Sequence, residues 1–492
     1  PNVSEYSVFD FEVARAAIDS GYNETMRLMP LIKQRIQKRN SVELIQKKRA
    51  DFFSNHVAVK VDKVYFENIS ESQAKYFKKI IKPDKNPQYL FMLKRNYFRL
   101  AGDANVRAVN PRLVLNKSTG YYDMFLEVKR EKDLHFDFGG NFSSRPINMG
   151  YVGIRKNWLG SESYALEANT YFGKLYNSAH ADLRIDFPGR FNFFVQPEFN
   201  LNKFNYFKSS TAFFEDVKPS YLIQSDGRFA LNFGIPARNK GRFIASGTIF
   251  EVVNKYYQTQ QFTQADTSDR TNFKAYSVGL TYERNSYNFR MYANRGSFFS
   301  VMVKNVEGNE VTNLGSTAPS RDTINQYHHW WQFKLVWDNY FAKAGPVHFG
   351  LYTELNLSTE NFFANYTSSI LMAPGFMPTP ESQTLFLDKF HAYNYGGIGL
   401  LTVWEIVSNL DLRLEGYVFQ PVNEILKGSD GLSATFGDAF SKRYFLADAN
   451  VVYHSPLGPI SLSFNYYYDE FDKPYSLLFH FGFIIFNKRT LD

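Results

Sequence analysis

The chain offers two fragments of an acyl-hydrolase site, the dipeptides Asp226-Gly227 and Asp430-Gly431. In a serine–aspartate dyad the carboxylate accepts a proton from a serine that stands on a strained turn within a Gly-x-Ser-x-Gly motif. No Gly-x-Ser-x-Gly occurs anywhere in the 492 residues. Because an isolated Asp-Gly dipeptide favours tight turns, both are predicted to be loop or hairpin turns, and we expect no catalytic residue in this chain.

A second candidate is the pair His328-His329, which stands beside Trp330 and Trp331. Imidazole is a common metal ligand, but consecutive residues of a strand point to opposite faces, so two adjacent histidines cannot easily share one ion. The pattern favours a histidine inside a barrel or at its rim, next to interfacial aromatic residues. We expect neither a metal site nor a cofactor.

Charged residues that alternate with apolar ones form a third group. Their apolar neighbours, such as Leu183 and Leu414, occupy the opposite face of an extended chain. Two roles are open for these charges: a substrate path through a hydrated interior, or paired charges that brace it. The charged residues in question are Asp182, Arg184, Asp186, Glu354, Arg413 and Glu415.

Strands must position these side chains, and the clearest strands are the last two, at 459–468 and 476–485. In the first of them Ile460, Leu462 and Phe464 alternate with serine and asparagine, so one face is apolar and the other polar. A soluble sandwich also alternates in this way. Charges recur on the polar face over most of the chain, however. A closed barrel in lipid accommodates both faces, with the apolar side outward and the charged side lining a hydrated lumen.

The composition agrees with membrane insertion by strands. Aromatic residues make up 18% of the chain, which suits aromatic girdles at the two membrane interfaces. The sequence contains no run of the roughly 18 apolar residues that a membrane-spanning helix needs. It contains no cysteine, and hence no disulfide framework. It begins at Pro1 without a signal peptide, so we expect a mature or proteolysed piece, or part of something longer.

From residue 133 to the C-terminus the alternation predicts about sixteen antiparallel strands. The connections after even-numbered strands are mostly short, for example 158–160 and 188–190. Short turns on one rim and long loops on the other are expected of an outer-membrane barrel whose short rim faces the periplasm. This parity returns both ends of the barrel to the periplasmic side. The predicted long loops, all after odd-numbered strands, are 205–218, 257–270, 307–326, 359–393 and 422–444.

The region before the barrel has a different pattern. Residues 56–132 predict a small α+β module of order β-α-α-β-β, in which Ser70 and Gln73 form a capping box. Residues 1–55 predict helices, the first ending at Gly21 and the second interrupted at Pro30. These helices carry a basic cluster within a chain of net charge +8. We interpret the cluster as a solvated or anionic-lipid-facing surface, with a nucleic-acid site as the alternative. Its members are Lys33, Arg35, Lys38, Arg39, Lys47, Lys48 and Arg49.

An α+β module followed by such a barrel resembles a POTRA domain and the barrel of the bacterial surface antigen superfamily, which includes the outer-membrane assembly protein BamA. The resemblance covers residues 56–492, and Asn294-Arg-Gly-Ser-Phe-Phe-Ser300 is similar to the superfamily's Arg-Gly turn before an aromatic strand. The segment from Phe9-Asp-Phe11 to Gly21-Tyr22, with the closing residues 483–492, resembles the branch in which a patatin-like phospholipase domain is fused ahead of POTRA and barrel. The resemblance implies a helical remnant of that domain with a linker at 1–55, a POTRA-like domain at 56–132 and a transmembrane β-barrel at 133–492.

One long loop departs from the assembly proteins. That family carries an Arg-Gly-aromatic tip folded into the lumen, whereas the corresponding segment here reads Ala373-Pro-Gly-Phe-Met-Pro-Thr-Pro-Glu381. No arginine is present between residues 359 and 393. We therefore expect that this loop does not make the arginine contact to the barrel wall that the assembly proteins have.

Three functions remain open on the sequence. The first is an anchor or translocator for a lipid acyl hydrolase whose domain is mostly absent, and the second is a non-enzymatic assembly or secretion factor that receives client strands by β-augmentation. A passive pore is the third. Gly139, Gly140 and Gly482 fall at the closing seam, where they either permit opening or accommodate curvature.

The resemblance also implies where such a protein resides. We expect the outer membrane of a Gram-negative bacterium, with the POTRA-like domain and both barrel termini in the periplasm. The expected partners are outer-membrane lipids, and periplasmic or outer-membrane proteins that bind the POTRA-like domain, with no nucleic acid among them.

Overall fold

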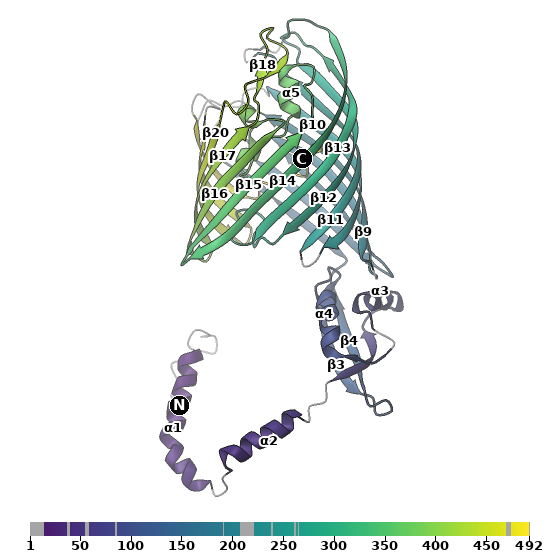
Figure 1. Cartoon of the computed structure of the whole chain (residues 1–492), viewed down its shortest axis with the longest axis vertical. Helices are drawn as coiled ribbons and strands as arrows, with labels where there is room; N and C mark the ends of the chain where they lie inside the picture. The colour runs from purple at the N-terminus through teal and green to yellow at the C-terminus, as the bar shows by residue number, and fades with distance from the viewer. Residues whose placement is uncertain are drawn as a thin grey trace. The chain divides into compact units, whose positions relative to one another are not determined.

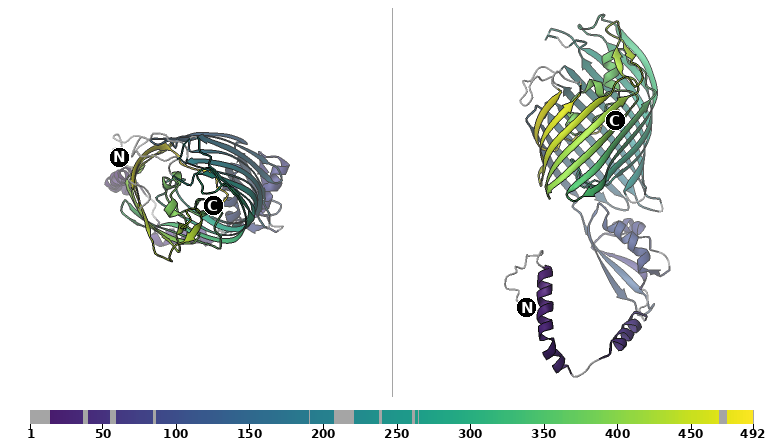
Figure 2. Two further views of the ribbon diagram at one scale, coloured as in Figure 1. Left: turned by 90° about the horizontal axis from the view of Figure 1, so that it is seen from above. Right: turned by 60° about the vertical axis from the view of Figure 1, so that its left-hand side comes forward.

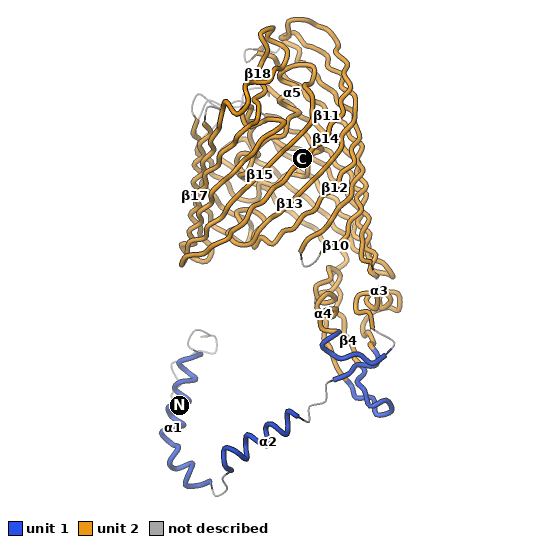
Figure 3. Tube along the Cα trace, in the orientation of Figure 1, with its two compact units in different colours: residues 1–63, 84–92, 114–123 blue, residues 64–83, 93–113, 124–492 orange. Residues whose placement is uncertain are grey.

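The structure is a computed structural model that describes most of the chain. Its backbone divides into two compact units, shown in Figure 3: residues 1–63, 84–92 and 114–123 form one, and residues 64–83, 93–113 and 124–492 form the other. The described residues are 14–36, 40–54, 59–83, 86–189, 191–206, 221–237, 240–259, 262–263, 265–468 and 474–491.

Two helices come first, α1 at Ala14–Arg35 and α2 at Val42–Ser54 (Figure 1). The predicted stop at Gly21 is wrong, because α1 continues through Gly21 and through Pro30. Glycine costs a helix about 1 kcal/mol but does not end it unless the following backbone leaves helical geometry. Neither helix buries a residue, so the basic cluster lies on a solvated surface as far as it is described. Lys38 and Arg39 fall outside the described residues.

A small α+β region follows, and its strands form one sheet of order β2-β1-β4-β3. The predicted capping box opens α3: the Ser70 hydroxyl accepts from the Gln73 amide, and the Gln73 side chain accepts from the Ser70 amide. Phe77 and Ile81 are completely buried on the apolar side of this helix. The predicted order is confirmed except for the added short strand β2. The elements are β1 Lys60–Glu67, α3 Glu71–Ile81, β2 Gln88–Tyr89, α4 Leu90–Ala101, β3 Val106–Leu115 and β4 Tyr122–Arg130.

Sixteen antiparallel strands then close into a barrel (Figures 1 and 2). Neighbours in the chain are neighbours in the barrel, and β22 returns to β5 to close it. The predicted class and strand number are confirmed. The strands are β5 Leu134–Ser143, β6 Met149–Leu159, β7 Ser163–Gly173, β8 Tyr176–Phe187, β9 Phe193–Tyr206, β10 Leu222–Ala237, β11 Gly241–Tyr256, β12 Asp269–Asn285, β13 Ser297–Asn313, β14 Thr323–Ala344, β15 Val347–Ser358, β16 Tyr395–Val407, β17 Leu410–Pro421, β20 Tyr444–Ser455, β21 Gly458–Tyr467 and β22 Tyr475–Gly482.

Alternate residues of these strands point to opposite faces, as the sequence predicts. On β21, Leu462 and Phe464 are 45% and 50% exposed, whereas Ser461 and Ser463 are fully buried. His480 on β22 is also fully buried and faces the interior. The barrel therefore has an apolar outer wall and a polar inner wall. A sandwich with Leu462 and Phe464 sealed in its core is excluded.

Two strands extend further than predicted. β13 reaches Asn313 and β14 begins at Thr323, so most of the predicted loop 307–326 is paired strand. Outward-facing positions in this extension are polar, for example Glu307 and Asn309. The polar side chains led to the prediction of a loop. The two strands nevertheless stay paired beyond the apolar band of the barrel, because pairing satisfies their backbone amides and carbonyls.

The interior of the barrel is filled by the connection between β15 and β16. This segment, residues 359–394, contains α5 at Tyr366–Met372 and two short 3-10 turns, η2 at Ser382–Thr384 and η3 at Asp388–Phe390. Viewed from above, it lies within the ring of strands (Figure 2). Its residues Phe376 and Phe390 pack with Phe419 of β17 in a buried apolar cluster. We name residues 359–394 the luminal loop.

The luminal loop also contacts a small hairpin formed by β18, Ile425–Lys427, and β19, Ala434–Phe436. Ile370 of α5 packs with Ile425 of this hairpin. Among the described residues, no helix combines the length and the apolar character needed to cross a membrane.

Candidate functional site at the barrel seam

The seam between the first and last barrel strands is short. β22 pairs with β5 at three positions, His480 with Ser143, Phe481 with Phe142, and Gly482 with Asn141. On its other side β5 pairs with β6 over the whole of 134–141. The Gly140 carbonyl also accepts from the Phe483 amide at 3.3 Å, so within the described part of the chain residues 134–139 of β5 have no partner at the seam. An unpaired strand edge is a template for another strand.

Glycines fix the point at which the seam ends. Gly482 has φ +101, a left-handed conformation that side chains rarely adopt, and a Cβ there would lie 2.1 Å from the Gly140 carbonyl oxygen. A Cβ on Gly140, at φ +153, would lie 2.3 Å from the Met149 carbonyl oxygen. The backbones at Gly482, Gly140 and Met149 therefore lie so close together that positions 482 and 140 have no room for a Cβ. Of the two roles left open by the sequence, this geometry supports accommodation of a sharp bend.

The chain leaves the wall at Gly482, so the predicted final strand 475–486 is too long. Beyond it, residues 483–491 cross the interior and attach to the wall formed by β8 to β13. Backbone carbonyls make much of this attachment: Lys488 O accepts from Asn200 and Asn202 at 2.6 and 3.1 Å, and Leu491 O accepts from Lys304 at 2.5 Å. We name residues 483–491 the C-terminal segment.

Side chains of the C-terminal segment add further bonds to the same wall. Arg489 stacks over Phe204 at 3.8 Å from the ring centroid and donates to the Tyr206 hydroxyl at 2.6 Å. Thr490 donates to the Asp226 carboxylate at 2.8 Å. Residues 483–491, which would otherwise extend the last strand along β5, are thus bonded to the inner wall instead.

Inside the seam, four buried side chains from three distant segments meet. Tyr292 donates its hydroxyl proton to Glu381, and its oxygen lies 2.7 Å from His480 Nε2. Since a phenol has one proton, His480 Nε2 must be the donor in the second bond. Ser463 donates to the same Glu381 oxygen at 2.9 Å. We name Tyr292, Glu381, Ser463 and His480 the luminal latch, because it ties the luminal loop to the last two strands.

Tyr292 belongs to the connection between β12 and β13, residues 286–296, which folds into the barrel. Arg413 of β17 donates to the carbonyls of Tyr292 and Ala293 at 3.1 and 2.9 Å. Asn294 donates to Asp411 at 3.0 Å. These bonds hold Tyr292 in its left-handed conformation, φ +57, and thereby set the position of the latch.

The Arg-Gly turn identified in the sequence lies in this same connection. Arg295 pairs with Glu405 at 2.8 Å. Gly296 has φ +95, and a Cβ there would lie 2.2 Å from the Ser286 carbonyl oxygen. The glycine lets the chain turn back into β13, while the arginine fastens the turn to β16.

A cavity of about 380 Å³ lies beside the latch and is lined by Arg413, Glu415 and Asp448 among others. Carboxyl and amide oxygens of Asp448 and Asn450 are buried nearby without a protein partner in the described residues. Buried polar atoms of this kind are usually bonded to water. A polar cavity with such oxygens is what the sequence predicts for a hydrated lumen.

The charged strand residues identified in the sequence face the interior and are paired. Arg413 meets Glu415 at 2.8 Å, Arg184 meets Asp186 at 2.8 Å, and Asp182 bonds His180 at 3.0 Å. Glu354 accepts from Tyr395 at 2.6 Å and lies 3.4 Å from Lys334. These are local pairs on the same or adjacent strands, which supports bracing of the wall rather than a substrate path.

The two Asp-Gly dipeptides differ from each other. Asp430-Gly431 forms the predicted turn, with φ +70 at Gly431, between β18 and β19. The amides of Leu432 and Ser433 donate to Asp430 and hold the pKa of its carboxyl below its usual range.

The turn prediction for Asp226-Gly227 is wrong, because both residues lie in the middle of β10. Asp226 accepts bonds from Asn202 and Thr490 on the inner side. Gly227 pairs with Leu201 and Glu251 on the neighbouring strands, so register pairing overrides the local turn preference.

The histidine pair divides between the two faces, as predicted. His328 is buried and bonds Glu310 at 2.9 Å, whereas His329 is on the outer side and bonds Asn305 at 2.8 Å. Trp330 is buried and Trp331 is 54% exposed. In the described ranges, no three His, Cys, Asp or Glu side chains form a group that could hold a metal ion.

The members of the latch were not identified from the sequence as a group. Tyr292, Glu381 and His480 are far apart in the chain and none stands in a motif of its own. The one available signal was His480, a polar residue between Phe479 and Phe481 in a mainly apolar last strand. The sequence also showed that the luminal loop lacks an arginine, and in the structure Glu381 is one of the loop residues that bond the wall, through Ser463.

Comparisons with known proteins identify the fold. Neither a protein-family model nor a curated protein sequence matches the chain. A crystal structure of BamA from Haemophilus ducreyi lacking POTRA domains 1–3 is similar, with a TM-score of 0.57 and 11% identity over 86% of this chain and 84% of that one. CdiB structures from Acinetobacter baumannii and Escherichia coli, also 11% identical, align with TM-scores of 0.49 and 0.48 over 86% and 87% of this chain and 73% and 77% of theirs. The chain therefore has the fold of a BamA-like barrel.

Proposed function

We propose that this protein is an outer-membrane assembly or secretion factor that opens its barrel seam to receive β-strands of client proteins. The observation that carries the proposal is the three-pair seam, which leaves residues 134–139 of β5 without a backbone partner on that side. A barrel made only to seal a membrane gains by pairing every edge, since each unsatisfied backbone group in hydrocarbon costs several kcal/mol. An incoming strand would satisfy this edge.

The free part of β5 has the side-chain pattern that such a strand would extend. Phe136 and Phe138 point outward and are 59% and 76% exposed. His135 and Asp137 occupy the alternate positions. A client strand with alternating apolar and polar residues would continue both walls of the barrel.

We further propose the orientation given by the loops. The short connections would face the periplasm, and with them the α+β region and the open part of the seam, which lies toward the start of β5. A client arriving from the periplasm would meet the unpaired edge first. The fold shared with a BamA structure supports this placement in the outer membrane.

The two other functions have less support. A passive pore needs an open lumen, whereas the luminal loop and the C-terminal segment occupy this one. Anchoring of a patatin-like hydrolase stays a prediction from the resemblance, since the segment Phe9-Asp-Phe11 lies outside the described residues and neither a family model nor a curated sequence of such a domain matches the chain.

A reversible disulfide across the seam tests the proposal. The chain has no cysteine, so Phe142→Cys with Phe481→Cys introduces a single cross-strand pair. In proteoliposomes, the oxidised variant should fail to insert an unfolded client barrel into a protease-resistant form, and reduction should restore insertion. The matched control places cysteines at Val451 and Leu462, which pair between the fully paired strands β20 and β21. Equal insertion by the oxidised seam variant and the oxidised control would refute a role for seam opening.

A further inference from the structure

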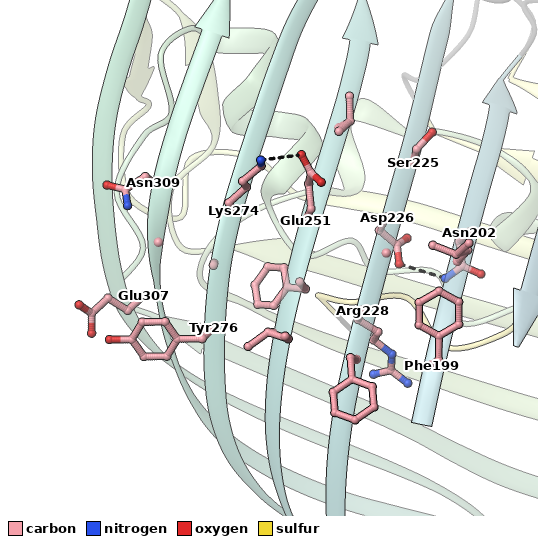
Figure 4. A pocket seen from close by; sticks show the side chains of 18 of the residues that line it. Phe199, Asn202, Ser225, Asp226, Arg228, Glu251, Lys274, Tyr276, Glu307 and Asn309 are labelled. Atoms are coloured by element: carbon pink, nitrogen blue, oxygen red, sulfur yellow. Dashed lines mark hydrogen bonds and ion pairs between the residues drawn. The ribbon is translucent and has the colours of Figure 1, made fainter. Parts of the chain in front are cut away.

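The outer wall of the barrel has a hollow across β9 to β14. Figure 4 shows this site, a cavity of about 840 Å³ that is wide open to the outside. Gly227 lies on its floor, because it has no side chain and faces outward between Leu201 and Glu251. Phe199 and Phe229 line it toward the short-turn rim. The hollow is thus long, apolar at its lower end and shaped for a hydrocarbon chain.

The upper end of the hollow is polar. Lys203 and Lys274 line it, on β9 and β12 respectively. The part of β9 below Lys203, from Phe193 to Leu201, is about nine residues long, and every second side chain faces outward; this is the length that a tilted strand needs to cross a bilayer. Lys203 is therefore at the level of lipid headgroups on the long-loop side. Charged side chains at this level contact headgroups rather than acyl chains.

Just above the hollow, two cations face each other. Lys255 of β11 and Arg270 of β12 are direct cross-strand partners in the register, and both are exposed. Like charges directly opposite each other destabilise a sheet, unless an anion lies between them. Neither residue forms an ion pair within the described part of the chain. This pair is the observation that points to an anionic ligand.

The nearby carboxylates do not neutralise these cations. Glu251 accepts from Asn272 at 2.8 Å and lies 3.7 Å from Lys274. Glu307 of β13 lies opposite Tyr276 of β12, its cross-strand partner. Each carboxylate is thus occupied by its own neighbours, and Lys203, Lys255 and Arg270 remain as a net positive surface above an apolar hollow.

We propose that this surface is a binding site for a phosphorylated acyl glycolipid of the outer leaflet. One acyl chain would lie in the hollow along Gly227, and phosphate would lie between Lys255 and Arg270 within reach of Lys203. The hollow is wide and the cations are spread over several strands. A lipid with several acyl chains and a phosphorylated sugar fits this arrangement better than a phospholipid with a single small headgroup does. The inference rests on the proposed placement of the barrel in an outer membrane.

Native mass spectrometry of the detergent-solubilised full chain tests the site, with lipid A, dephosphorylated lipid A and phosphatidylglycerol as probes. Lipid A should bind more tightly than either of the others. The double variant Lys255→Gln and Arg270→Gln should bind lipid A roughly 10- to 30-fold more weakly. Gly227→Leu should weaken all acyl lipids, because its side chain fills the hollow while meeting only the flexible end of Leu201.

Lys156→Gln is the matched control, since Lys156 lies next to exposed Trp158 near the short-turn end of β6. It should leave lipid A binding unchanged. Binding of lipid A by the double variant at the wild-type level, or equal binding of phosphatidylglycerol, would overturn the proposal. Failure of seam function is a separate result, because a protein that retains lipid A yet inserts no client would refute the proposed function alone.

Discussion

The hydroxyl oxygen of Tyr292 lies 2.7 Å from Nε2 of His480, so a connection that folds in from one rim of the barrel contacts the strand that closes it. The same hydroxyl donates to Glu381 of the luminal loop. One phenol therefore links the turn after β12, the loop after β15 and the last strand. Any movement of β22 away from β5 must break this link or carry the luminal loop with it.

Removing the Tyr292 hydroxyl should loosen the last strand. Tyr292→Phe leaves Glu381 and His480 each without one buried partner, which costs about 1–3 kcal/mol of unfolding free energy. The midpoint of urea unfolding, followed by tryptophan fluorescence in micelles, should fall. The disulfide between cysteines at 142 and 481 should then also exchange faster with reductant. Tyr453→Phe, on the exposed outer face of β20, should change neither quantity.

A side chain at Gly482 should strain the seam. Gly482→Ala places a Cβ 2.1 Å from the Gly140 carbonyl and forces alanine into φ +101, with an expected loss of about 1–3 kcal/mol. Gly416→Ala is the control, because nothing lies within 4 Å of a Cβ there. Thermal unfolding should show a lower midpoint for the first variant only. Equal midpoints would show that the bend at Gly482 is not required.

Arg413 should contribute more to stability than Arg184. Arg413→Met leaves Glu415 and two backbone carbonyls buried without their partner, which should cost about 3–5 kcal/mol. Arg184 and Asp186 are each about one third exposed, so Arg184→Met should cost at most about 1 kcal/mol. Urea titrations of both variants give the comparison. A similar loss for the two would contradict a structural role for Arg413 in holding the turn that carries Tyr292.

Shortening the C-terminus should open the lumen. Deletion of residues 484–492 removes the chain that attaches to Asn200, Asn202 and Lys304, while leaving β22 intact. In planar bilayers we expect small, infrequent conductance steps for the full chain and larger, longer steps for the shortened one. Arg489→Ala alone removes the stack on Phe204 and should give an intermediate effect. Large, steady conductance of the unaltered protein would instead support a passive pore.

The sequence by itself determined the barrel, because an apolar and a polar face repeat every second residue and only one arrangement accommodates both. It predicted the strand number, the two rims, the inward charges and the glycines of the seam. It misjudged Asp226-Gly227 and the loop 307–326, where pairing with neighbouring strands outweighs local preference.

Tertiary structure decided what lies inside the barrel. The departure of residues 483–491 from the wall depends on Gly482, Gly140 and Met149 approaching one another, and those residues are adjacent only in the folded chain. The latch likewise joins Tyr292, Glu381 and His480 by bonds over long sequence separations. Periodicity reports which face a residue occupies, but not which distant residue it meets there. That pairing is set by closure of the barrel and by the path of the chain through its interior.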